Sequence, residues 1–240
     1  MYPQLSATRI CHIAAVALIF IIVISVSGHA QQAAPPTDVA GFFRETTGEW
    51  IGTVEQYTNG VKADTKYFHA VVRQTSPDTY EAVFDYYRID KQTHAPVQVG
   101  VTNMTSKITP EGTAKNTITG KGDVFVDPNT LRHEEHTLSE ILRMTPSGNL
   151  EGKGSGKISI SGIALGAGKN GKVSNYTSTW ALNNGIFTIN EQLSVTFKAL
   201  FFAKHYNIIY NFEGKRGSDI MGLMKSAGAN SNPTSTTSNY

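Results

Sequence analysis

Residues 187–197 read FTINEQLSVTF, and this stretch decides the fold class. Apolar side chains fall at every second position, and Thr, Asn, Gln and Ser stand between them. This alternation is typical of a β-strand that has one face in a core and the other in solvent. The exception is Glu191, which interrupts the apolar face. The stretch therefore predicts a half-buried strand that carries one inward-pointing carboxylate.

Similar alternation runs through residues 80–86 and 206–212, and β-forming residues are abundant from Gly48 to Arg216. Turn signals divide this region at short intervals. They are Asn59-Gly60, Ser76-Pro77-Asp78, Pro110-Glu111-Gly112, Asp127-Pro128-Asn129, Pro146-Ser147-Gly148-Asn149, Gly166 to Gly171, and Asn183-Asn184-Gly185. The pattern predicts an all-β fold of nine or ten antiparallel strands joined as hairpins. Such a meander tends to close into an up-and-down barrel, because closure removes exposed strand edges.

Short helices are expected at both ends of the barrel. Residues 38–44 form the first, with Asp38 or Thr37 as its N-cap, and residues 218–227 form the second, capped by Ser218. Residues 228–240 are rich in Asn, Ser and Thr, which is typical of a disordered tail. The predicted barrel domain is therefore 38–217, followed by a helix and tail over 218–240.

Residues 1–30 have the features of a secretory signal peptide. Ile13 to Val26 is an apolar run, and Gly28-His29-Ala30 offers small residues for cleavage before Gln31. The alternative is an uncleaved anchor, but the run is short for a bilayer span, which needs about 20 residues. The segment predicts a secreted or periplasmic protein, with 31–37 as a linker.

Composition excludes several kinds of site. The only cysteine, Cys11, lies in the leader, so the mature chain has no disulfide and no thiolate ligand. Loss of Arg9 with the leader leaves 20 basic and 19 acidic residues, a balance that argues against nucleic-acid binding. We expect no cofactor, and membrane contact only while the signal peptide is attached. The oligomeric state stays open.

Two places in the sequence resemble the lipocalin-like (calycin) β-barrels, in particular their small bacterial secreted members. The first strand opens Gly48-Glu49-Trp50, and the last ends at Arg216. The resemblance implies that Trp50 plugs one end of the barrel and that Arg216 packs across its ring in a cation–π contact. These two residues would then close the barrel without touching a ligand. The chain lacks the disulfide of typical lipocalins.

Glu191 is the first candidate for a ligand-binding residue, because a buried carboxylate must be paired, hydrogen-bonded or protonated. Arg88 shares the face of the aromatic residues of its strand and is a candidate partner. Two alternatives stay open: a β-bulge or an internal salt bridge at Glu191, and a solvated Arg88 at a strand end. The inward aromatic side chains could line a cavity or fill it. They are Tyr80, Phe84, Tyr86 and Tyr210.

Two motifs suggest chemistry that their context does not support. His133-Glu134-Glu135-His136 has histidines three apart, which a strand places on opposite faces, so it predicts a charged exposed strand and no metal site. Residues 166–172 resemble a phosphate-binding loop, but Val173 stands where that loop needs a hydroxyl. We expect a hairpin loop there.

The leading hypothesis is a barrel that binds a small, largely apolar ligand in its interior. A second hypothesis is a cavity enzyme, an isomerase, cyclase or hydrolase, in which Glu191 acts as acid or base. A third is a non-catalytic envelope or surface protein with a filled barrel. No sequence motif assigns a catalytic residue, so binding is preferred over catalysis.

Overall fold

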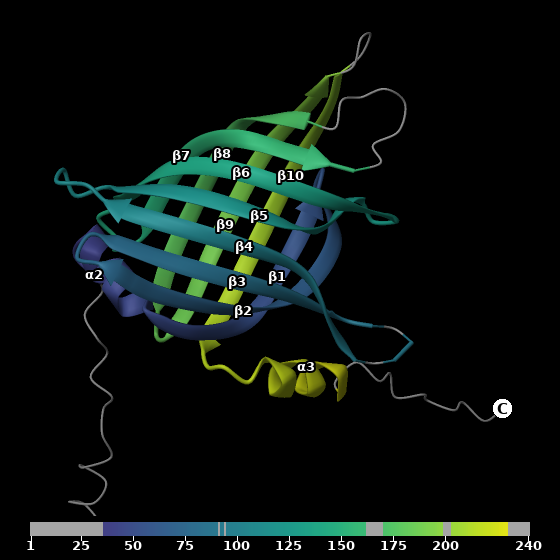
Figure 1. Ribbon diagram of the computed structural model, residues 1–240, viewed down its shortest axis with the longest axis horizontal. Helices are drawn as coiled ribbons and strands as arrows, with labels where there is room; N and C mark the ends of the chain where they lie inside the picture. The colour runs from purple at the N-terminus through teal and green to yellow at the C-terminus, as the bar shows by residue number, and fades with distance from the viewer. Residues whose placement is uncertain (1–35, 91, 94, 162–169, 199–202, 230–240) are drawn as a thin grey trace, which may run out of the picture. The chain divides into compact units, whose positions relative to one another are not determined.

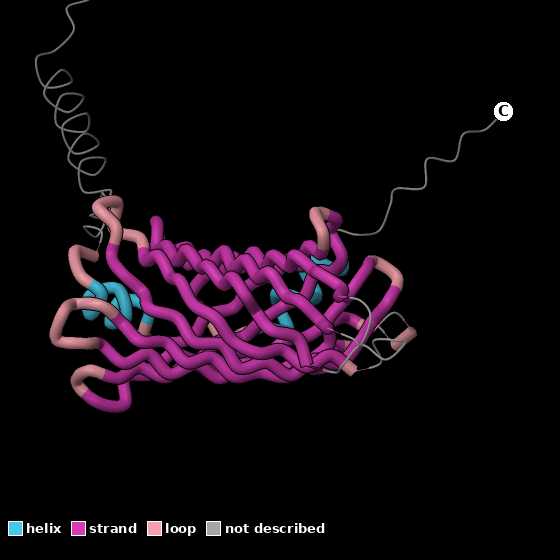
Figure 2. The backbone as a smooth tube through the Cα atoms, turned by 90° about the horizontal axis from the view of Figure 1, so that it is seen from above, coloured by secondary structure: helices cyan, strands magenta, loops and turns pink. Residues whose placement is uncertain are grey.

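Ten antiparallel strands close into one barrel in the computed structural model, which describes residues 36–90, 92–93, 95–161, 170–198 and 203–229. Each strand pairs with the next along the chain, and the first pairs with the last (Figures 1 and 2). The strands are β1 Gly48–Thr58, β2 Val61–Ser76, β3 Thr79–Ile89, β4 Pro96–Ile108, β5 Ala114–Asp127, β6 Thr130–Met144, β7 Leu150–Ile160, β8 Asn170–Asn183, β9 Ile186–Lys198 and β10 Ala203–Arg216. The predicted up-and-down barrel is confirmed.

Two short helices flank the barrel, as predicted. Helix α2, Val39–Thr46, begins after Asp38, whose side chain accepts a hydrogen bond from Gly41 N at 2.6 Å. Helix α3, Ile220–Ala229, lies beside β1 and β2 (Figure 1). Its cap is Asp219, which accepts from Gly222 N at 2.8 Å, so the expectation of a Ser218 cap is wrong. Neither described helix is long and apolar enough to span a membrane.

Tight turns set the hairpin registers. Asn59 and Gly60 have φ of 52° and 82°, and Asn184 and Gly185 have φ of 53° and 76°. Positive φ at both central residues defines the type I′ turn, whose twist matches that of paired strands. No turn was predicted between β3 and β4, yet the chain turns there too. The predicted leader, most of the predicted 166–171 loop and residues 230–240 of the predicted tail lie outside the described residues.

Helix α2 fills one end of the barrel with aromatic side chains. Phe42 and Phe43 are fully buried, and the Phe43 ring stacks on Tyr80 with centroids 5.3 Å apart. Trp50 packs against Phe187 at 5.4 Å and donates its Nε1 hydrogen to Thr46 O at 2.7 Å. This end is therefore closed by the packing of aromatic side chains.

Arg216 completes the same end. Its guanidinium carbon lies 4.7 Å from the centroid of the Trp50 ring. Its nitrogens donate to the carbonyl oxygens of Thr47, at 2.8 Å, and of Glu45. One side chain at the end of the last strand thus holds the end of α2 against the first strand.

The opposite end is bridged by polar contacts from β5 to β1. Gln56 Nε2 and Thr58 Oγ1 donate to Phe125 O at 2.6 and 2.9 Å, and Phe125 N donates to Gln56 Oε1 at 3.3 Å. Three strands separate β1 from β5 in the sheet, so these bonds cross the interior. The two ends therefore differ, one packed with aromatic rings and the other tied by hydrogen bonds.

Candidate functional site

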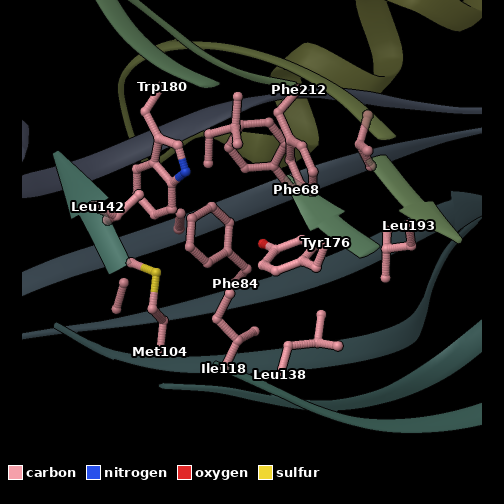
Figure 3. Close-up of a cluster of buried hydrophobic side chains, with 14 of the residues drawn as sticks. Phe68, Phe84, Met104, Ile118, Leu138, Leu142, Tyr176, Trp180, Leu193 and Phe212 are labelled. Atoms are coloured by element: carbon pink, nitrogen blue, oxygen red, sulfur yellow. The ribbon is translucent and has the colours of Figure 1, made fainter. Parts of the chain in front are cut away.

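A cavity of about 70 Å³ lies inside the barrel between these two ends. Apolar side chains form much of its wall, including Val54, Phe84, Ile118, Leu138, Ile189 and Phe212. Figure 3 shows Phe84, Ile118, Leu138 and Phe212 converging on the interior. Nine charged or polar side chains also line it. They are Lys66, Tyr86, Thr102, Lys121, Asp123, Glu134, His136, Glu191 and Tyr210.

The size of the cavity bounds what it can hold. Pockets for drug-sized ligands measure about 300–1,000 Å³. One water needs about 10–15 Å³, so 70 Å³ has room for a few waters or a molecule of a few heavy atoms. The cavity is therefore small, and its wall has both polar and apolar parts.

Glycines on β5 make room for the polar part of the cavity. A Cβ atom at Gly120 would lie 2.6 Å from ring atoms of His136, and one at Gly122 would lie 2.9 Å from Gly100 Cα. Both distances are too short for real side chains, so these positions must stay without one. The missing side chains let His136 turn inward.

Glu191 points into the cavity, as the strand alternation predicts. Its register is regular on both sides, opposite Tyr210 of β10 and Ser178 of β8, so no bulge turns it outward. Its Oε1 accepts a hydrogen bond from the Tyr176 hydroxyl at 2.9 Å. The partner is a tyrosine and not the arginine that the sequence suggested.

Burial raises the pKa of Glu191 to about 7, and the nearby Glu140 carboxylate acts in the same direction. The hydrogen bond from Tyr176 and the charge of His136 act against this rise. A carboxyl group with a pKa near 7 gains or loses its proton easily at neutral pH. Glu191 can therefore serve as a hydrogen-bond donor in one form and as an acceptor in the other.

Glu134 and His136 form a second pair on the cavity wall, 3.4 Å apart between Oε1 and Nδ1. Glu134 is only 8% exposed, and its other oxygen, Oε2, is buried without a hydrogen-bond partner among the described residues. Burial alone would lower the pKa of His136, but the hydrogen bond and charge of Glu134 raise it above its usual value. The pair therefore favours a charged imidazole beside a carboxylate that is half satisfied.

The prediction of an exposed charged strand at residues 133–136 is wrong for half of its residues. His133 and Glu135 face solvent, but Glu134 and His136 face the interior. A run of charged residues favours an exposed strand, and only the glycines of the neighbouring strand indicate that one face has room for such side chains. Among the described residues, no three His, Cys, Asp or Glu side chains come together as a metal site would require.

Lys66 connects the cavity to the hydrogen-bonded end. Its Nζ donates to Asp123 O and lies 3.9 Å from Asp64 Oδ2. Burial lowers the pKa of this ammonium group. Arg88 also binds Asp64, at 2.5 Å from Nη2 to Oδ2, and contacts Asp123 at 3.3 Å. Arg88 thus belongs to the tied end of the barrel; it is not a partner of Glu191 and does not line the cavity.

The aromatic candidates predicted as ligand residues also divide, between the cavity and the packed end of the barrel. Phe84, Tyr86 and Tyr210 line the cavity, whereas Tyr80 lies under helix α2 against Phe43. Burial raises the pKa of Tyr210, so its hydroxyl keeps its proton at neutral pH. Four of the six predicted ligand residues are therefore brought together, and Arg88 and Tyr80 are not.

A second buried carboxylate, Glu140, lies on the same strand as Glu134 but has full hydrogen bonding. Asn116 Nδ2 donates to Oε1 at 2.8 Å, and Ser178 Oγ donates to Oε2 at 2.5 Å. A Cβ atom at Gly152 would lie 2.0 Å from Oε2, so this glycine makes the space for the carboxylate. We call Glu140, Asn116 and Ser178 the Glu140 cluster. The sequence analysis missed it.

Comparison with known proteins gives no relative to guide the assignment. No protein-family model matches the chain, and no curated protein matches it in sequence. Function must therefore be argued from the cavity itself.

Proposed function

We propose that this protein binds a small, largely apolar molecule inside its barrel. The observation that carries the proposal is a cavity with apolar walls and a few buried polar side chains at one side. Binding sites in barrels have this composition, because apolar contact supplies affinity and a few polar groups fix orientation. The barrel fold is compatible with such binding.

The signal peptide and the resemblance at Trp50 and Arg216 add to this proposal. A secreted or periplasmic location would give the barrel access to small molecules outside the cytoplasm. The contact of Arg216 with the Trp50 ring supports a relationship with lipocalin-like barrels, although those of the transport type have eight strands and this barrel has ten. Trp50 and Arg216 would then stabilise one end and leave binding to the cavity.

The test is native mass spectrometry of residues 31–240 purified from the envelope of the natural host. We expect a reproducible added mass of a small molecule that is lost in Leu138→Phe, which fills the cavity wall. The matched control is Ile141→Phe on the same strand, because Ile141 is exposed on the outer face. A bare mass that stays bare with a panel of small apolar molecules would contradict interior binding and favour a filled barrel.

Acid–base catalysis in the same cavity is a second candidate function, favoured by the position of Glu191. The carboxyl group faces the cavity, contacts the Tyr176 hydroxyl and has a pKa near neutrality. Such a group can transfer a proton to or from a bound molecule. If the bound molecule is converted, Glu191→Gln should abolish conversion and leave binding in place. Conversion that survives this change would exclude Glu191 as the acid or base.

A further inference from the structure

The cavity wall holds one carboxylate, Glu134, whose hydrogen bonding is incomplete. Its Oε2 atom is buried and accepts no hydrogen bond from a described residue, although Oε1 lies beside His136. A carboxylate oxygen deprived of both water and a donor destabilises the folded state. A buried carboxylate with a free oxygen therefore needs a donor that the described protein does not supply.

Three cationic side chains line the cavity. Lys66 donates to the carbonyl of Asp123, and His136 is paired with Glu134 through the other oxygen. Lys121 lines the cavity but is exposed to solvent. None of the three donates a hydrogen bond to Glu134 Oε2.

Three acidic side chains line the cavity: Asp123, Glu134 and Glu191. The Glu140 carboxylate also lies close enough to influence Glu191. The hydroxyls of Tyr86 and Tyr210 can donate or accept, so they do not discriminate between ligands. A ligand with a carboxylate would add another negative charge beside these groups, whereas a positively charged donor would reduce their repulsion.

We infer that the cavity selects a small amine, with its apolar part against Ile118, Leu138 and Ile189 and its nitrogen donating to Glu134 Oε2. Asp123 and Glu191 are further acidic side chains of the cavity wall and attract the same charge. A hydrogen bond between an ammonium group and a carboxylate is stronger than one between neutral groups. This inference rests on the proposed interior binding and names the chemical class that binds.

The experiment compares n-butylamine, n-butanol and butyrate, three probes that share a short apolar chain and differ in the polar end. Methyl resonances of Ile118, Leu138 and Ile189 report on binding inside the barrel and give a Kd for each probe by NMR titration at neutral pH. We expect butylamine to bind at least about tenfold more tightly than either other probe, since one charge-assisted bond contributes about 1.5–3 kcal/mol. Butanol or butyrate binding as tightly as butylamine would overturn the inference and leave interior binding standing.

Two variants test whether the amine binds at Glu134. Glu134→Gln keeps the shape of the side chain and should weaken butylamine binding about tenfold, with little change for butanol. The matched control is Glu135→Gln, the same substitution on the outer face of the same strand, which should leave both Kd values unchanged. An unchanged amine Kd in Glu134→Gln would overturn the assignment to Glu134.

The probe comparison in the unaltered protein needs no variant, so a folding defect in Glu134→Gln would not prevent a decision. In that case Glu191→Gln, which removes another acidic group of the cavity wall, gives a second measurement and should also weaken amine binding. If no probe shifts the methyl resonances, the proposed interior binding fails together with the amine inference. If all three bind equally, only the amine inference fails.

Discussion

Glu134 and Glu140 stand six positions apart on the same strand, both face the interior, and both are nine-tenths or more buried. Glu140 has a donor on each oxygen, from Asn116 and Ser178. Glu134 is paired with His136 and attracts the charge of Lys66, but one of its oxygens has no hydrogen-bond partner among the described residues. The difference separates a carboxylate that is part of the structure from one that is available for binding.

The largest effect should come from breaking the Glu140 cluster. Glu140→Ala leaves the Asn116 amide and the Ser178 hydroxyl buried without their acceptor and opens a small void. We expect a loss of about 3 kcal/mol in the free energy of unfolding, measured by urea denaturation. A loss below about 1 kcal/mol would mean that the cluster contributes little and would remove the contrast with Glu134.

A smaller, pH-dependent effect is expected at Glu191. Its pKa is about 7 in the folded protein against 4.5 for the ordinary group, so the folded state holds the proton more tightly. The stability that it contributes is complete below pH 4.5 and is lost as the pH rises through 7. His136, whose pKa is also raised, acts in the same direction at higher pH.

Glu191→Gln should therefore be more stable than the unaltered protein at pH 8, by about 2 kcal/mol, and no more stable at pH 4. Urea denaturation at the two pH values measures this, with Glu135→Gln as the control for loss of a carboxylate. If Glu191→Gln instead gained stability at pH 4 and lost this gain at pH 8, the result would contradict the prediction. It would show that folding stabilises the ionised form of Glu191.

The smallest effect is expected at Glu134. Glu134→Gln removes the carboxylate partner of His136 but also the charged oxygen that lacks a donor. These two effects oppose each other, so the free energy of unfolding should change by less than about 1 kcal/mol. The same change should lower the pKa of His136, which loses its carboxylate partner, and NMR titration of its ring resonances measures that shift. A destabilisation as large as that of Glu140→Ala would place Glu134 with the structural carboxylates.

Much of the fold could be predicted from alternation and turns. The hairpin turns at Asn59-Gly60 and Asn184-Gly185 form as expected, and the number of strands falls within the predicted range. Glu191 could be found because one charged residue interrupted an otherwise apolar face. Closure between β1 and β10 was inferred only from the tendency of meanders to remove their edges.

The remainder of the site depends on neighbours that are distant in sequence. Alternation places Arg88 on the inner face but does not say that Asp64 and Asp123 meet it there. It also cannot separate Tyr80, at the packed end, from Tyr86, at the cavity, because both share one face. Glu134 and His136 were missed because a run of charged residues normally lies in water.

The contacts of Arg216 have a consequence for the order in which the chain is made. The barrel closes by pairing its first strand with its last, so residues near position 50 must wait for residues near position 216. Until the final strand pairs, the earlier strands can form only an open sheet with two free edges. Arg216 is the last residue of that strand, and it binds the ring and carbonyl groups around Trp50 that were made first. Closure is therefore a late event, and the edges of β1 and β9 need protection from other chains until then.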